Sequence, residues 1–133
     1  MSAYRPDIQF TGETVIVSYI ADPSLGYGRF RLENHGLATV TAAVESAWIE
    51  LAGHGRPLAK FSIFDLDREQ TVNAAGFNVA RETDLRFLVS FPKIAYIPGF
   101  GASAAVGVLL RVDDLELQAV STIQFENRIP QGH

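Results

Sequence analysis

The stretch LELQAVSTIQFE, residues 115–126, decides the fold class of this chain. Its side chains alternate without a break between a mainly apolar set and a mainly polar set: Leu115, Leu117, Ala119, Ser121, Ile123 and Phe125 against Glu116, Gln118, Val120, Thr122, Gln124 and Glu126. Successive side chains of a β-strand point to opposite faces, whereas a helix would spread these apolar positions around its circumference. The stretch is therefore predicted to form a strand with one buried face.

The run before this strand has the same period. From Ala104 to Val112, two sets of side chains alternate: Val106, Val108, Leu110 and Val112 against Ala105, Gly107, Leu109 and Arg111. Asp113-Asp114 follows directly and separates this run from Leu115. A two-residue connection between two such runs predicts an antiparallel hairpin. We expect its Leu115 face to close a core and its opposite face, around Val120 and Thr122, to be open enough to meet a partner.

Further extended segments follow one another along the chain and are separated by Gly, Pro and Asn. They are predicted at residues 8–10, 13–20, 29–33, 38–51, 58–66, 70–72, 77–79 and 83–91. The first strand is expected to kink at Thr11-Gly12, and the long strand 38–51 to bend or bulge near Ser46. Residues 52–57 are predicted to form a loop because of their Gly and Pro content.

These segments predict one all-β domain that covers residues 1–133. A chain of this length is enough for one compact core. We expect a single antiparallel two-sheet sandwich of the immunoglobulin-like kind, with about seven to nine strands. A jelly roll or a small barrel would show the same alternation, so the topology stays open.

Composition limits the compartment and the partners. The chain has no cysteine, which excludes disulfides and thiolate metal sites and fits a reducing, cytoplasmic setting. Its first residues lack the apolar stretch of a signal peptide, although earlier removal of a leader would allow export. The net charge of -4, without a basic block, argues against nucleic acid, and no apolar run suits a membrane-spanning helix. The apolar content of 47% predicts a surface covered by a protein partner, with a second copy of this chain as one option.

Three pieces of the chain carry a family resemblance: FRLENHGLATVTAAV, VNAAGFNVARETDLRFLVSF and VGVLLRVDDLELQAVSTIQF. In this order they resemble bacterial immunoglobulin-like modules of the CARDB type, which read strand, Asn-x-Gly turn, strand, a Gly-containing turn before a Phe-rich strand, and a long final hairpin. The resemblance implies an immunoglobulin-like fold and a tendency to bind, and it transfers no residue-specific role.

The immunoglobulin strand order would gather loops 21–28, 52–57 and 92–103 at one end of the sandwich. Their aromatic, basic and Gly-rich composition suits a contact surface. The candidate contact residues are Leu25, Tyr27, His54, Arg56, Lys93, Tyr96 and Phe100. The competing interpretation is that Tyr96, Ile97 and Phe100 fold inward and fill the end of the core.

The opposite end would bring Asn34-His35 close to four acidic side chains. Carboxylate oxygens are the ligands that calcium prefers, so a calcium site is one hypothesis and solvated turn acids are the other. The candidate ligands are Asp65, Asp67, Asp113 and Asp114.

Catalytic motifs do not emerge from the residues. His35, His54 and His133 occur without an HExxH pair, and there is no GxSxG elbow. We therefore expect no enzyme activity and no cofactor. The edge segment Val15 to Ile20 is apolar on both faces, so it is expected either to pair with a second copy or to be covered by another segment of the same chain.

The sequence thus predicts a noncatalytic interaction or assembly module of a bacterial-type soluble protein, which associates with itself. Two alternatives stay open. The first is a structural subunit of a phage or another large particle. The second is a small-molecule or carbohydrate binder that uses Trp48, Tyr96 or Phe100 as a stacking platform.

Overall fold

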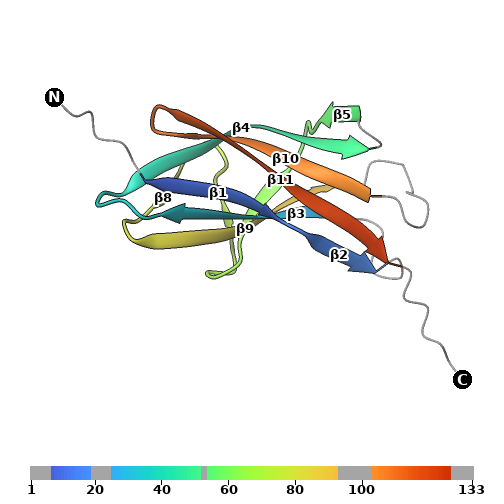
Figure 1. The fold of residues 1–133 in the computed structure, drawn as a ribbon, viewed down its shortest axis with the longest axis horizontal. Helices are drawn as coiled ribbons and strands as arrows, with labels where there is room; N and C mark the ends of the chain where they lie inside the picture. Colours follow the sequence, from blue (N-terminus) through green and yellow to red (C-terminus); the bar gives the residue numbers. More distant parts are fainter. Residues whose placement is uncertain (1–6, 19–24, 52–53, 93–102, 127–133) are drawn as a thin grey trace, which may run out of the picture.

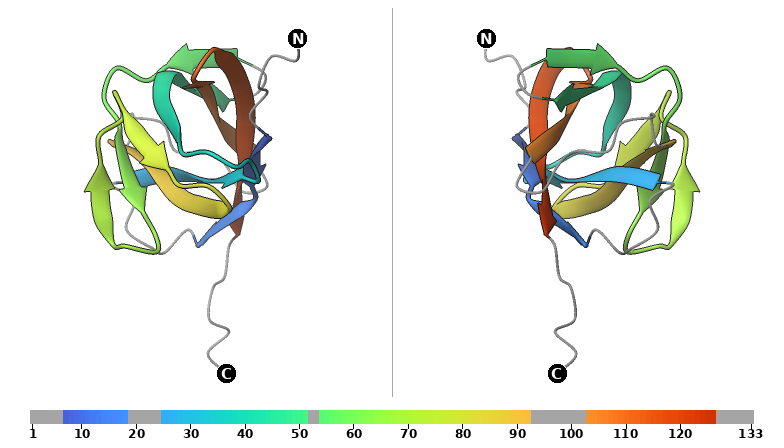
Figure 2. Two further views of the ribbon diagram at one scale, coloured as in Figure 1. Left: turned by 90° about the vertical axis from the view of Figure 1, so that its left-hand side faces the viewer. Right: turned by 90° about the vertical axis from the view of Figure 1, so that its right-hand side faces the viewer.

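The chain folds into two packed β-sheets (Figure 1). The computed structural model describes residues 7–18, 25–51, 54–92 and 103–126, and within these ranges it contains eleven strands and no helix. No helix of a length and hydropathy suited to crossing a bilayer occurs in these ranges either. Figure 2 shows the two sheets end-on as two layers. The predicted all-β two-sheet sandwich is confirmed.

The first sheet is antiparallel throughout its described pairs. Its long strands alternate sharply: in the segment 29–33, which was predicted to be extended, Phe30 and Leu32 are fully buried between charged neighbours. In spatial order its strands are β1 (Ile8–Glu13), β3 (Leu25–Asn34), β9 (Thr83–Pro92), β6 (Ser62–Asp65) and β7 (Gln70–Val72).

The second sheet contains the predicted hairpin at its centre. In spatial order its strands are β2 (Val15–Ser18), β11 (Leu115–Glu126), β10 (Ser103–Val112), β4 (Val40–Leu51) and β5 (His54–Pro57), with β8 (Phe77–Val79) also paired to β4. The β2–β11 pair is parallel, which makes this sheet mixed rather than purely antiparallel.

The hairpin has the predicted register. Val112 lies opposite Leu115, so Asp113 and Asp114 form a two-residue turn in which Asp113 has a φ of 51°. Ala119, Ser121 and Ile123 are buried, and Val120 on the other face remains 38% exposed. The period of two therefore predicted both the strand and the side that it buries.

The core lies between the sheets and is formed by the inward rows of both. Its aromatic centre is a stack in which the rings of Phe10 and Phe87 lie 5.6 Å and 5.7 Å from the ring of Phe30. Val106, Val108 and Leu110 of the second sheet are fully buried in the same cluster. With no disulfide available, burial of this apolar surface provides the main stabilisation, at about 25 cal/mol per Å² removed from water.

One lateral side of the sandwich is closed by a strand that changes sheets. β1 pairs with β3 in the first sheet, and after Thr14 the chain continues as β2 beside β11 in the second. Gly12 allows this crossing, because a Cβ at that position would lie 1.9 Å from the carbonyl oxygen of Val120. The predicted kink at Thr11-Gly12 thus marks the close approach, while the strand itself breaks two residues later.

Ser121 fixes the crossing. Its buried hydroxyl donates to the carbonyl oxygen of Glu13 at 2.6 Å and accepts from the backbone N–H of Arg29 at 3.0 Å. One side chain of the second sheet therefore ties two strands of the first. The edge segment Val15–Ser18 is consequently paired with its own chain along one side.

The other lateral side is closed in a similar way by β7 and β8. A turn at residues 73–76 separates these strands, and the N–H of Val44 donates to the carbonyl oxygen of Ala74 at 2.8 Å. Both short strands, at 70–72 and 77–79, are confirmed. The predicted irregularity in β4 is confirmed as well, because the register against β10 shifts between Val44 and Ser46.

Two predictions about this half of the chain were wrong. Residues 54–57 form β5 rather than loop, because β4 beyond its bulge offers a free edge with which four residues pair despite Gly55 and Pro57. The strand predicted at 58–66 is confined to β6, since Leu58 turns inward and its N–H donates to the carbonyl oxygen of Ala47 at 2.9 Å. Because short strands such as β5 are present, the number of strands in the described residues is higher than the predicted seven to nine.

Candidate functional site

The outer face of the second sheet carries an uncharged patch. Strand register aligns Trp48, Gly107 and Val120 in one row across β4, β10 and β11. Neighbouring rows add further apolar or small side chains that are partly or fully exposed. We call this group the outer patch: Ile16, Trp48, Ala105, Leu109, Val120 and Thr122.

Trp48 is held flat at the centre of the outer patch. Its indole ring lies over Gly107, where a Cβ would be 2.1 Å from Cε2 of the ring. Its indole N–H donates to Oε1 of Glu50 at 3.1 Å. A glycine below and a hydrogen bond at the edge orient the ring while one face stays available, which presents a rigid aromatic group.

Charged side chains occur at the margins of the outer patch. Arg111 forms ion pairs with Glu45 and, at 3.3 Å, with Glu116, all near the hairpin turn. Glu50 lies on the other side of Trp48 and accepts its N–H. An uncharged aromatic centre with a charged margin is the arrangement found in protein interfaces.

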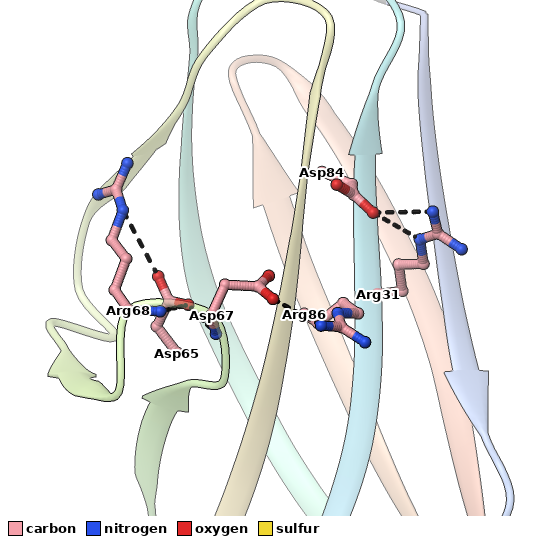
Figure 3. Close-up of polar contacts among 6 residues, drawn as sticks. All are labelled: Arg31, Asp65, Asp67, Arg68, Asp84 and Arg86. Carbon is pink, nitrogen blue, oxygen red and sulfur yellow. Dashed lines mark hydrogen bonds and ion pairs between the residues drawn. The ribbon is translucent and has the colours of Figure 1, made fainter.

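The outer face of the first sheet differs, because ion pairs cover its half nearest the start of β9. Arg31 contacts Asp84 at 2.8 Å and Arg86 contacts Asp67 at 2.6 Å (Figure 3). The hydrogen bond from Arg86 lowers the pKa of Asp67 below the ordinary aspartate value. Exposed pairs of this kind contribute little to stability, and they suit a face turned to solvent.

The predicted contact surface at the loop end is described only in part. Leu25 and Tyr27 lie on β3, and His54 and Arg56 lie on β5 of the other sheet, with Arg56 exposed. Lys93, Tyr96 and Phe100 lie outside the described residues. Whether Tyr96 and Phe100 face solvent or the core therefore stays a prediction.

The predicted calcium ligands are not brought together. Asp65 is 3% exposed and accepts the backbone N–H groups of Asp67 at 2.9 Å and Arg68 at 3.0 Å, while Asp67 pairs with Arg86. Asp113 and Asp114 form the hairpin turn, where the Asp113 N–H donates to the carbonyl oxygen of Thr41. In ranges 7–18, 25–51, 54–92 and 103–126, no three His, Asp or Glu residues are grouped closely enough to hold a metal.

Sequence reasoning identified members of the outer patch but not their arrangement. It singled out Val120 and Thr122 on the last strand and Trp48 as a stacking platform, but it did not place Trp48, Gly107 and Val120 in one row. The sequence feature that could have indicated this row is Gly107 in the interior of a strand, because a glycine there often marks the close approach of another group. Trp48 alone did not show that its ring is that group.

Comparisons with known proteins establish the fold. No family model matches the chain, and no curated protein matches it. A chain of the complex between the Salmonella enterica SafA pilin and the SafB chaperone is similar with a TM-score of 0.53 and 9% identity, covering 98% of this chain and 59% of that one. The E. coli chaperone DraB is similar with a TM-score of 0.55 and 8% identity, covering 96% of this chain and 58% of DraB. The PapD-like domain of human CEP192 is similar with a TM-score of 0.50 and 10% identity, covering 97% of this chain and 92% of that domain.

A family 123 glycoside hydrolase from Clostridium perfringens is similar as well, with a TM-score of 0.55 and 10% identity over 90% of this chain and 23% of that one. The chain thus spans under a quarter of that enzyme and somewhat more than half of the two chaperone-related chains. At these identities the likeness concerns the fold alone. The chain has an immunoglobulin-like β-sandwich fold shared with PapD-like domains, and the CARDB-type assignment stays a prediction.

Proposed function

We propose that the chain is a noncatalytic interaction and assembly module that associates with itself through the outer patch. The carrying observation is that Trp48, Leu109 and Val120 form an uncharged, partly exposed surface on one sheet, while ion pairs mark the outer face of the other. The similarity to the chaperone DraB and to a chain of the SafA pilin–SafB chaperone complex is consistent with a protein-binding role.

The physical driving force would be removal of this apolar surface from water. Each buried CH₂ contributes about 0.8 kcal/mol, and a central aromatic side chain is the residue type that most often dominates an interface. Trp48 is already oriented before contact, so little rotamer entropy is lost when a partner covers it.

Light scattering during size-exclusion chromatography tests the proposal. We expect the wild-type chain to form a small closed oligomer and the Val120→Glu variant to be monomeric, because that variant places a charge in the central row. Gln9→Glu is the matched control, since it adds the same charge to an exposed position of β1 on the other sheet and should leave the oligomer intact. A wild-type monomer, or equal behaviour of both variants, contradicts self-association through the outer patch. An open-ended assembly would instead favour the particle-subunit alternative.

The fixed indole of Trp48 favours one second candidate, a stacking platform for a carbohydrate ring. Trp48 is the single tryptophan, so its fluorescence reports directly on this site. Quenching or a spectral shift with one member of a panel of oligosaccharides would support that function, and an unchanged spectrum with every sugar would reject it.

A further inference from the structure

The first half of β9 lacks a neighbour on one side. β9 begins at Thr83, but β6 pairs only with Phe87–Ser90, and the last bond between these segments runs from the N–H of Leu66 to the carbonyl oxygen of Arg86 at 2.9 Å. β6 ends there because the buried carboxylate of Asp65 accepts the N–H groups of Asp67 and Arg68 and turns the chain away.

This ending leaves a backbone position open at Asp84. In an antiparallel strand the N–H and C=O of one residue point to the same side, and those of residues two apart point alike. The Arg86 carbonyl points toward β6, so the backbone N–H and C=O of Asp84 point to that side as well. Within the described ranges no backbone bond to Asp84 from this side occurs.

A cleft of about 410 Å³ lies at this position, between the start of β9 and the strands β7 and β8. Buried or partly buried apolar side chains of Val72, Phe77, Val79 and Leu85 line it, together with polar side chains such as Thr71 and Asn78. Its volume is within the range of about 300–1,000 Å³ that ligand sites show.

The charges at the rim of the cleft are largely neutralised. Four charged residues line the cleft: Asp65, Asp67, Arg68 and Asp84. Asp67 and Asp84 are paired with Arg86 and Arg31 of the first sheet, and Arg68 lies 4.0 Å from the carboxylate of Asp65 (Figure 3). Because these carboxylates already have partners, the cleft offers little attraction to a cation. An uncharged occupant with both apolar and polar side chains suits it better.

We propose that this cleft binds an uncharged extended peptide segment, which adds as a strand beside Asp84 in line with β6. The backbone groups of Asp84 would give the main-chain hydrogen bonds, and the apolar lining around Phe77 and Leu85 would receive alternate side chains of the peptide. This site is separate from the outer patch, so its test does not depend on self-association.

The probe is the acetylated and amidated heptapeptide Thr-Val-Thr-Val-Thr-Val-Thr, followed by amide NMR shifts of the whole chain. We expect the largest shifts at Thr83–Leu85, Thr71 and Val79. Asp84→Pro should weaken binding at least tenfold because it removes the N–H that faces the cleft, a change that an edge position tolerates. Asp84→Ala also loses the ion pair with Arg31 but keeps the N–H, so its affinity should stay within threefold.

Methylated probes decide the question on the wild-type chain, should the proline variant fail to fold. In an added strand, only every second N–H group of the peptide points toward Asp84. One probe is therefore methylated on its three valine nitrogens and a second probe on its two inner threonine nitrogens. We expect one of these two probes to lose binding and the other to keep it. The proposal is overturned by an absence of binding at millimolar probe, by shifts that gather on the outer patch, or by equal effects of the two methylated probes.

Discussion

At the scale of single residues, Asn34 lies at the start of a turn, and its side chain also links distant parts of the chain through hydrogen bonds. The family resemblance placed Asn34 at the start of an Asn-x-Gly turn, and turn residues are usually exposed, but Asn34 has no positive φ and is only 1% exposed. Its amide nitrogen lies 2.9 to 3.2 Å from the carbonyl oxygens of Ala38, Val79 and Ala80, and its oxygen accepts the N–H of Gly36. No local pattern could have predicted this link, because two of its partners lie more than forty residues away.

Replacing this amide tests its contribution. We expect Asn34→Ala to lower the free energy of unfolding by about 2–3 kcal/mol, because buried carbonyl groups lose their donor. His35→Ala, at the exposed neighbouring position, should change it by less than about 0.5 kcal/mol. Urea denaturation measures both, and a similar small effect for the two variants would mean that water replaces the amide.

Asp67 gives a prediction about pH. The hydrogen bond from Arg86 lowers the pKa of Asp67 in the folded chain, so the pair stabilises the fold above the unfolded pKa, and this contribution is lost as the pH falls through the folded pKa. We expect NMR titration to give a lower carboxyl midpoint for Asp67 in the wild-type chain than in Arg86→Gln. High salt should shrink the difference, because the pair is exposed. Equal midpoints at low salt would show that the pair does not form in solution.

At the scale of elements, alternation predicted those strands whose faces differ in polarity. β9, β10 and β11 appeared with their buried sides. The short β7 and β8 and the bulge in β4 also appeared at the predicted positions, although no buried side had been predicted for the two short strands. Alternation did not predict β5, which exists because β4 offers an edge, nor the change of sheet between β1 and β2. Both depend on which strands become neighbours, and a single segment does not contain that information.

The crossing of the first strand depends on Gly12, and a glycine pair tests it. A Cβ at Gly12 would meet the backbone of β11, which cannot move without breaking the second sheet, so Gly12→Ala should cost about 3 kcal/mol or more. Gly76→Ala is the control, since a Cβ there meets nothing within 4 Å and should leave stability unchanged or raise it by a few tenths of a kcal/mol. Thermal melts compare the two variants. Equal melting temperatures would mean that a Cβ at position 12 fits between β1 and β11 without displacing the backbone.

At the scale of the whole molecule, the two outer faces have different characters. Composition predicted covered apolar surface, and the strand periods predicted part of it at Val120 and Thr122. The alignment of Trp48 with Gly107 and Val120 could not be predicted, because Trp48 and Gly107 are 59 positions apart in sequence and meet only through the register of β4 with β10. The cleft beside β9 was missed for the same reason, since it exists only where β6 stops short of the start of β9.

The difference between the faces predicts how association responds to salt. Contact through the outer patch buries uncharged side chains, so the dissociation constant should change by less than threefold between 50 mM and 500 mM NaCl. Contact through the first sheet would instead place Arg31, Asp84 and Arg86 at the interface, and salt would weaken it strongly. Sedimentation velocity at several salt concentrations measures this dependence. A tenfold or larger loss of affinity would assign the contact to the charged face and contradict the role proposed for Trp48 and Val120.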